Sequence, residues 1–285
     1  MRKIESVGVV GAGTMGLGIA QVCAANGFET FLFDVNRDQV DRALATIDSN
    51  LSKSLEKGRI SDSEKTITLS RIHPVAKLAQ LKVDLVIEAA IEKLDVKKEL
   101  FVELEEVNSG NAILATNTSS ISISAIAKAL RDPSVCIGLH FFNPADRMKL
   151  VEIISGETTH PAIVASIKSF ALAIGKTAVV AKDSPGFIVN RVARHFYVES
   201  LKLMERNAAD ATTMDALLRS AGFRMGPFEL MDLIGVDTNL AVTKSVYEGF
   251  GRAHKFAPNK IQQQLVDDGR CGRKSGGGFY DYAKT

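Results

Sequence analysis

Two side chains that lie near each other in the sequence, His140 and Glu152, have the chemistry of an acid–base pair. The histidine ends the apolar run VCIGLHFF, and Asn143-Pro144 interrupts that run at once, so the imidazole is predicted at the mouth of a strand. The glutamate lies inside a second apolar run, MKLVEII, where a carboxylate needs a partner. A carboxylate beside an imidazole fixes its tautomer and favours its protonated form. The pattern is typical of a general base, although a buried structural histidine and an edge-strand charge explain it equally well.

A glycine-rich turn near the N-terminus has the residue types that bind a dinucleotide. The run KIESVGVVGAGTMGLGIAQVCAANG changes from a strand pattern to helical spacing across Gly11, Gly13 and Gly16. These glycines would allow a tight turn, the approach of a pyrophosphate and close packing of helix on strand. Asp34 closes the next predicted strand about 20 residues further on, where the acid that binds the ribose hydroxyls is expected. The carboxylate favours NAD over NADP, and Arg37 close by keeps NADP open as a second cofactor.

The elements that must position these side chains alternate between strands and helices. Further short strands are predicted at 67–72, 83–89 and 111–117, and helices at 39–57, 94–106 and 122–130. Such alternation predicts a parallel, doubly wound sheet whose ligands bind at the carboxyl ends of the strands. Those ends carry Glu88 to Glu92, Thr116 to Ser120, and His140. Three strand ends are therefore expected to supply polar side chains to one crevice.

The pattern changes after Lys182-Asp183-Ser184-Pro185-Gly186, which reads as a linker. Only helical patterns follow, so we predict an α/β Rossmann-like doubly wound domain over residues 1–184 and a smaller all-α domain over residues 185–285. The first helix of the second domain, near 187–206, is apolar over much of its surface, and subunit contact would bury it. The aromatic residues at 279–282 predict that the end of the chain is packed down.

Composition narrows the class of protein further. The 285 residues carry 35 Lys and Arg against 33 Asp and Glu, a net charge of +2, which argues against a nucleic-acid or membrane-surface protein. Cys23, Cys136 and Cys271 lie far apart and offer no metal-ligand spacing. The sequence shows no signal segment and no apolar run long enough for a membrane span. We therefore expect a cytoplasmic protein without a bound metal.

Motifs from end to end resemble those of the 3-hydroxyacyl-CoA dehydrogenase family, and most of all its short, single-chain 3-hydroxybutyryl-CoA dehydrogenases. In the family's order they are GAGTMGLGIAQ, DLVIEAAIEKLDVKKELF, ATNTSSISI, GLHFFNPADRMKLVEII, KDSPGFIVNR, MGPFELMDLIGVD and GRKSGGGFYDY. The resemblance implies an NAD-dependent oxidoreductase of fatty acid metabolism. Its expected reaction moves a hydride between NAD and C3 of a short (S)-3-hydroxyacyl-CoA, and a homodimer is implied as well.

The resemblance also implies roles for individual residues. His140 would be the base and Glu152 its orienting partner, while Ser119 and Asn190 would hydrogen-bond the oxygen functions of the substrate. Asn190 opens the first helix of the second domain, so this role would require the two domains to close over the substrate. The implied cofactor contacts are Gly11, Gly13, Thr14, Met15, Gly16, Asp34, Glu92, Lys97, Asn117 and Asn143. The implied contacts of the coenzyme A substrate further include Asn50 and Lys57.

One departure from the family pattern concerns the acyl group. Asp146-Arg147 stands where related chains usually carry a small or apolar pair. The two charges form either a weak ion pair at the rim or a contact that selects a longer or carboxylated acyl chain.

Two different functions also fit a two-domain chain that binds a dinucleotide. The first is a dehydrogenase of free hydroxy acids or sugar acids, and the basic residues around Lys53 and Lys57 favour a coenzyme A ester over such a substrate. The second is a dinucleotide-binding protein without turnover, since fold does not fix function. An enzyme is expected, because a protein that only binds would have no need of all four of Ser119, His140, Glu152 and Asn190.

Overall fold

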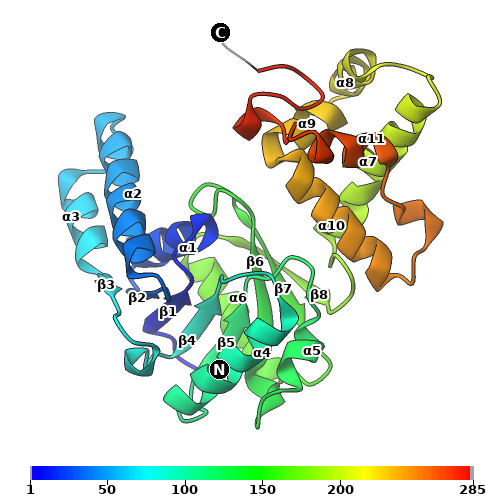
Figure 1. The fold of residues 1–285 in the computed structure, drawn as a ribbon. Helices are drawn as coiled ribbons and strands as arrows, with labels where there is room; N and C mark the ends of the chain where they lie inside the picture. The colour runs from blue at the N-terminus through cyan, green and yellow to red at the C-terminus, as the bar shows by residue number, and fades with distance from the viewer. Residues whose placement is uncertain (1, 283–285) are drawn as a thin grey trace. The chain divides into compact units, whose positions relative to one another are not determined.

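The computed structural model describes residues 2–282, and the chain divides between Ser184 and Pro185 into two units (Figure 1). The N-terminal unit is built on an eight-stranded sheet in the order β3-β2-β1-β4-β5-β6-β7-β8. Neighbouring strands are parallel except for β6 and β7, which are antiparallel. The strands are β1 Ser6–Val10, β2 Glu29–Phe33, β3 Ile72–Pro74, β4 Leu85–Glu88, β5 Ile113–Thr116, β6 Cys136–Phe141, β7 Leu150–Ser155 and β8 Thr177–Lys182.

Helices cover both faces of this sheet (Figure 1). On one face α1 and α6 share a core with the strands, in which Ile19 and Cys23 of α1 join Ile167 and Phe170 of α6. The opposite face is covered by α4 and α5 (Figure 1). Because both faces are covered, β4, β5 and β6 are buried along their whole length and read as continuous apolar runs. The helices are α1 Thr14–Ala25, α2 Arg37–Glu56, α3 Asp62–Ser70, α4 Leu94–Val107, α5 Ile123–Ala127 and α6 Pro161–Ala173.

The strand predicted at 67–72 is wrong for most of its length, because α3 occupies Asp62–Ser70 and β3 begins only at Ile72. A capping box starts this helix: the Ser61 hydroxyl accepts from the Glu64 N–H, and the Glu64 carboxylate accepts from the Ser61 N–H at 2.7 Å. The helix predicted at 122–130 is shorter than expected and ends at Ala127.

The C-terminal unit is helical, so the predicted fold class, a Rossmann-like α/β sheet followed by a smaller all-α part, is confirmed. The pattern at 229–250 forms two helices rather than one, since Gly235 has a φ of +104° and separates them. The helices are α7 Val189–Glu205, α8 Ala211–Ser220, α9 Pro227–Ile234, α10 Val236–Gly249 and α11 Lys260–Asp267. Within residues 2–282, no helix combines the length and the apolar character that crossing a bilayer requires.

Two buried carboxylates fasten the end of the chain to this helical unit. Asp232 accepts hydrogen bonds from the backbone N–H groups of Phe279 and Tyr280, each at 3.0 Å. Asp215 accepts from the Tyr280 hydroxyl at 2.7 Å and from the first turn of α9. The Phe279 ring packs edge-on against Phe228 with centroids 4.9 Å apart. The aromatic tail is therefore packed down, as predicted.

Candidate active site

The end of β6 brings His140 and Glu152 together. Antiparallel pairing with β7 places these two residues directly opposite each other. Opposite residues of an antiparallel pair project from the same face of the sheet, so the side chains meet. His140 Nδ1 lies 2.8 Å from Glu152 Oε2, and the residues are only 6% and 1% exposed. The pairing expected from their types is therefore present in the fold.

This contact determines which nitrogen of the imidazole can accept a proton. A carboxylate can only accept a hydrogen bond, so Nδ1 carries the hydrogen that points at Glu152. In a neutral His140 the other nitrogen, Nε2, is then the basic one. The ring also packs against Phe142, with centroids 4.6 Å apart, which restricts its rotation. The structure therefore fixes both the tautomer and the orientation of this imidazole.

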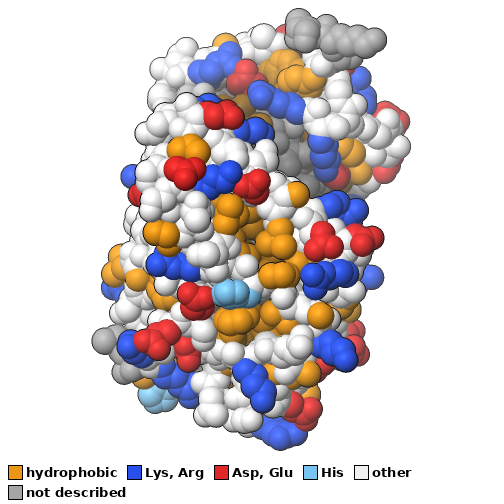
Figure 2. Space-filling view, turned by 90° about the vertical axis from the view of Figure 1, so that its left-hand side faces the viewer, with side chains coloured by type: hydrophobic (Ala, Val, Ile, Leu, Met, Phe, Trp, Pro, Cys, Tyr) orange, Lys and Arg blue, Asp and Glu red, His pale blue; other side chains and the backbone are white. Residues whose placement is uncertain are grey.

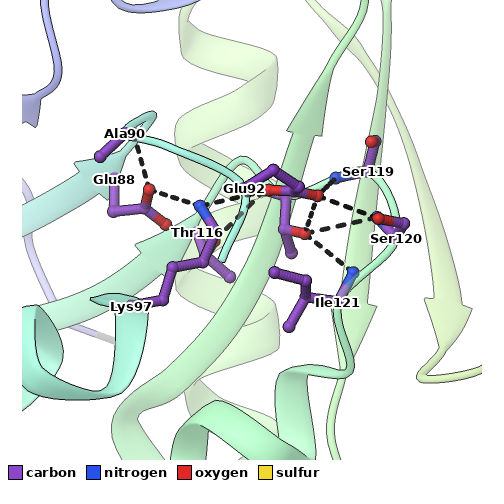
Figure 3. Close-up of polar contacts among 9 residues, drawn as sticks. Glu88, Ala90, Glu92, Lys97, Thr116, Ser119, Ser120 and Ile121 are labelled. Carbon is purple, nitrogen blue, oxygen red and sulfur yellow. Dashed lines mark hydrogen bonds and ion pairs between the residues drawn. The ribbon is translucent and has the colours of Figure 1, made fainter. Parts of the chain in front are cut away.

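The loop after β5 carries Ser119 and is tied to the neighbouring strand ends (Figure 3). Its first residue, Asn117, donates its N–H to the Glu88 carbonyl, and its side-chain oxygen accepts from the Phe141 N–H at 2.8 Å. Asn117 thus joins the end of β5 to the backbone beside His140. In this position the amide is a structural link, and the cofactor contact implied for Asn117 stays a prediction.

Glu92 and Lys97, both implied as cofactor contacts, lie beside the same loop (Figure 3). Lys97 Nζ is 2.6 Å from Glu88 Oε1 and 3.3 Å from Glu92 Oε2. Burial acts to raise the pKa of the Glu92 carboxyl, but the Lys97 ammonium and hydrogen bonds from the Ser119 loop outweigh it and hold that pKa below its usual value. The carboxylate form of Glu92 is therefore the one that the loop stabilises.

The turn between β6 and β7, residues 142–149, carries Asn143 and the Asp146-Arg147 pair. A buried lysine that sequence reasoning missed holds this turn: Lys176 Nζ donates to the carbonyls of Ala145 at 2.6 Å and Met148 at 2.8 Å. Ala145 in turn packs against Gly18 of α1. Nothing in the sequence distinguishes Lys176 from a surface lysine, because its partners are backbone atoms some thirty residues away. Asn143 itself is exposed.

In the glycine turn between β1 and α1, backbone atoms of the turn approach one another too closely for most side chains. Gly11 has a φ of +102°, which favours glycine. A Cβ on Gly16 would lie 1.7 Å from the Gly11 carbonyl oxygen, so only glycine lets the helix start this close to the strand. A Cβ on Gly13, by contrast, would meet nothing within 4 Å. Space is therefore open beside the N-terminus of α1, where Gly13 as N-cap provides no side-chain hydrogen bond.

Asp34 lies at the edge of this turn. Its Oδ2 accepts from the Ala12 N–H at 2.8 Å and its Oδ1 from the Asn36 N–H at 2.9 Å. These bonds fix the carboxylate next to the glycines and leave further lone pairs for hydroxyl donors. Thr14 and Met15 form the first turn of α1. The glycines and Asp34 are thus brought together as predicted from their spacing.

Three other predicted residues lie on or at the end of helices rather than at the strand ends. Asn50 and Lys57 are at the middle and the C-terminal end of α2, which packs on α1 and α3. Asn190 lies in the first turn of α7, in the C-terminal unit. The roles of these three residues stay predictions.

Charge on the surface follows the near-neutral composition. On the face seen in Figure 2, Lys and Arg side chains are interspersed with Asp and Glu, and hydrophobic side chains lie between them. Mixed charge of this kind produces no extended field of one sign on that face.

Comparison with known proteins identifies the class. Residues 6–184 match the family model described as 3-hydroxyacyl-CoA dehydrogenase, NAD binding domain, and residues 186–282 match 3-hydroxyacyl-CoA dehydrogenase, C-terminal domain. The chain therefore belongs to the 3-hydroxyacyl-CoA dehydrogenase family, which confirms the resemblance drawn from its motifs.

Individual relatives cover almost the whole chain. A 3-hydroxyadipyl-CoA dehydrogenase of Escherichia coli is 46% identical over 99% of this chain, which spans only 60% of that protein. A 3-hydroxybutyryl-CoA dehydrogenase of Bradyrhizobium diazoefficiens is 41% identical over 98% of this chain and 96% of its own length. The crystal structure of an (S)-3-hydroxybutyryl-CoA dehydrogenase from Ralstonia eutropha has a TM-score of 0.95 at 36% identity, covering 99% of this chain and all of that one.

The residues of the N-terminal unit fit the NAD that this family binds. An anionic pyrophosphate suits the N-terminus of α1, where the space beside Gly13 is open and no side chain caps the helix. The Asp34 carboxylate suits ribose hydroxyls, and a 2′-phosphate in the same place would be repelled. The cofactor is therefore NAD, and these residues are the ones that would hold it.

Two glycine variants separate the two roles of the glycine turn, binding of the cofactor and close packing of α1 on β1. Gly13→Ala places a methyl group in the open space, so we expect wild-type stability but a Kd for NADH raised about tenfold or more. Gly16→Ala drives a methyl group into backbone and should cost about 2–4 kcal/mol of stability. Thermal denaturation and titration of NADH fluorescence measure both effects. Unchanged NADH binding in Gly13→Ala would contradict the assignment of the turn to the pyrophosphate.

Proposed function

We propose that this chain catalyses reversible oxidation of a short (S)-3-hydroxyacyl-CoA to the 3-ketoacyl-CoA, with His140 as general base and acid. The 2.8 Å contact between His140 Nδ1 and Glu152 Oε2 at the end of the sheet carries the proposal. Membership in the 3-hydroxyacyl-CoA dehydrogenase family supports the reaction class. NAD, when bound, supplies the nicotinamide that accepts the hydride leaving C3 of the substrate.

Proton transfer is the part of the reaction that the protein's own side chains carry out. His140 Nε2 takes the proton of the 3-hydroxyl group, and Glu152 stabilises the imidazolium that forms. In the reverse direction the imidazolium returns that proton to the oxygen of a 3-ketoacyl thioester. Burial of both residues strengthens their interaction, because little water competes for it.

Substrate contacts are assigned by the family pattern. In this proposal Ser119 and Asn190 hydrogen-bond the oxygen functions of the acyl group, while Asn50 and Lys57 bind coenzyme A. The exposure of Lys57 supports contact with a phosphate-rich ligand, since its ammonium group is accessible. Thioesters of coenzyme A appear in the names of the relatives from Escherichia coli and Bradyrhizobium diazoefficiens, which supports the same substrate class.

A homodimer formed through the helical unit is part of the proposal. Large apolar side chains of this unit are exposed in the single chain: Val192 at 66%, Leu217 at 67%, Phe223 at 51% and Leu233 at 50%. Burial of such side chains against a second copy would remove them from water.

A comparison of substrates tests the reaction class. Oxidation of NADH is followed with acetoacetyl-CoA and with free acetoacetate at matched concentrations, and repeated with NADPH. We expect turnover of the thioester alone, and a kcat/KM for NADH at least about tenfold above that for NADPH because Asp34 repels a 2′-phosphate. Equal rates on free acetoacetate would favour a hydroxy-acid dehydrogenase, and no turnover of any 3-ketoacyl thioester would favour a binding protein.

Variants of the acid–base pair test the mechanism. His140→Ala should lower kcat by about 10²- to 10⁴-fold, because the group that takes the proton is lost. Glu152→Gln should also lower kcat strongly, since the amide no longer stabilises the imidazolium. Both variants should bind NADH with a Kd within about twofold of wild type. A His140→Ala enzyme that turns over as fast as its parent would refute the proposed base.

A carboxylated acyl chain is the second candidate substrate. The Escherichia coli relative, 46% identical to this chain, is named for 3-hydroxyadipyl-CoA, whose acyl chain ends in a carboxylate. Arg147 is available for such a group: its side chain is 74% exposed, and its Nε lies 3.7 Å from Asp146, too far for a strong hydrogen bond. A guanidinium at this turn could pair with the end of the chain.

Removal of that guanidinium distinguishes the two substrates. If Arg147 binds a terminal carboxylate, Arg147→Ala raises the KM for 3-oxoadipyl-CoA about tenfold and leaves that for acetoacetyl-CoA unchanged. Arg131→Ala is the matched control, since Arg131 is equally exposed at 79% and pairs with Glu106 instead. Equal changes for both thioesters, or none, would show that the Asp146-Arg147 pair is only a surface ion pair.

A further inference from the structure

One arginine of the helical unit is buried without an anionic partner among residues 2–282. Arg194 of α7 is only 3% exposed, and no carboxylate forms an ion pair with it there. Burial lowers the pKa of its guanidinium to about 10, and the Tyr197 hydroxyl opposes this effect, so the side chain stays charged at neutral pH. A buried charge normally has a partner of opposite sign, because removing it from water costs free energy that the partner offsets.

The contacts that the protein itself makes use two of the three nitrogen atoms of this guanidinium. Nε donates to the Asn190 carbonyl at 3.2 Å, and Nη1 donates to the Asn239 carbonyl and the Thr243 hydroxyl, each at 2.9 Å. The Tyr197 ring lies against one face of the cation, with its centroid 4.8 Å from the central carbon. Within residues 2–282 the third nitrogen, Nη2, donates no hydrogen bond, so one edge of the cation is left for another acceptor.

A second unsatisfied donor belongs to the residue that this guanidinium contacts on α10. Asn239 is 1% exposed, and its Oδ1 accepts from Gln262 Nε2 of α11 at 3.0 Å. Its Nδ2 group is buried and has no hydrogen-bond partner among the residues that the structure describes. Buried donors without an acceptor are rare in folded proteins. A cation with an unused edge and an amide with unused N–H groups are the donors that bind a carboxylate, whose two oxygens carry several lone pairs.

The position of Arg194 on α7 indicates which carboxylate this is. Arg194 follows Asn190 by four residues, so the two lie on the same face of the helix, about one turn or 5.4 Å apart. In the proposed function Asn190 contacts the oxygen functions of the acyl group. In a six-carbon dicarboxylic acyl chain, three carbon–carbon bonds of about 1.5 Å each separate C3 from the terminal carboxylate carbon. That span is comparable to the spacing of the two residues along α7.

We propose that Arg194 Nη2 and the Asn239 amide form a carboxylate-binding site within the helical unit, and that this site selects acyl chains that end in a carboxylate. The inference rests on the proposed function, which supplies the coenzyme A thioester and the role of Asn190. It assigns the carboxylate to a buried guanidinium instead of the exposed Arg147, because a charge-assisted hydrogen bond is stronger away from water. The alternative is an arginine that only ties α7 to α10.

A pair of thioesters isolates the terminal carboxylate. Adipyl-CoA and hexanoyl-CoA have six acyl carbons each, differ in that carboxylate alone and lack a 3-hydroxyl group, so neither is oxidised. Titration calorimetry of the NAD-bound enzyme gives both Kd values, and we expect adipyl-CoA to bind at least about tenfold more tightly. Arg194→Met removes the charge and should bring the ratio of the two Kd values to about one. Arg206→Met, the matched control at the exposed C-terminal end of α7, should keep the wild-type ratio.

A second variant tests the site without removing the arginine. Asn239→Asp places a carboxylate beside the guanidinium and keeps an oxygen that accepts from Gln262. We expect its Tm to equal or exceed that of wild type, because the buried cation gains a partner. The preference for adipyl-CoA should disappear, since the protein's own carboxylate then occupies the site. If Arg194→Met does not fold, this variant decides the question, because a purely structural arginine would leave the ratio of Kd values unchanged.

Three results would overturn the inference. They are a wild-type ratio near one, a folded Arg194→Met variant that keeps the preference, and a folded Asn239→Asp variant that keeps it. Loss of the preference in Arg147→Ala, with its retention in Arg194→Met, would move the carboxylate to the turn at residues 142–149. Failure of the proposed function is a separate result: the wild-type enzyme would reduce no 3-ketoacyl thioester with NADH, while the two Kd values would still test the site.

Discussion

The antiparallel pairing of β6 with β7 is the constraint on which the candidate site depends. The other pairs of neighbouring strands in this sheet are parallel, and only here does the chain reverse and return beside itself. The reversal sets His140 opposite Glu152, so that both side chains leave the same face. A slip of one residue would turn the carboxylate to the other face and leave an imidazole and a carboxylate buried apart. Register, rather than sequence proximity, makes these two residues a pair.

Around this pair, buried polar and charged groups find their partners locally at the ends of β4, β5 and β6. Glu88 and Lys97 compensate each other at the end of β4, and Asn117 links the end of β5 to the backbone of β6. Lys176 secures the turn after β6 through two carbonyl oxygens. Because these links come from elements distant in sequence, the loops they hold are fixed by the sheet rather than by their own conformational preference.

Much of the fold and of the candidate site could be predicted from the sequence, because these features depend on local sequence signals. Glycine spacing located the turn before α1, and apolar runs located β4, β5 and β6. The strand predicted at 67–72 failed because a capping box, a side-chain interaction at Ser61 and Glu64, outweighed a short apolar pattern. Alternation suggested only a parallel sheet and gave no sign that β7 reverses. The partners of Lys97 and Lys176 could not be predicted, since a lysine in a helix or before a strand is usually solvated and its burial is decided by tertiary packing.

The chain leaves the sheet after Phe141 and rejoins it at Leu150. The length of the turn between them, residues 142–149, therefore has no effect on the register of β6 and β7. Insertions or replacements there lengthen or recharge the surface beside the imidazole without moving the imidazole or its carboxylate. An inserted residue inside either strand, by contrast, would separate the two. The turn and the buried pair are therefore independent parts of this fold: the length and charge of the turn can change while the register of β6 and β7 keeps His140 opposite Glu152.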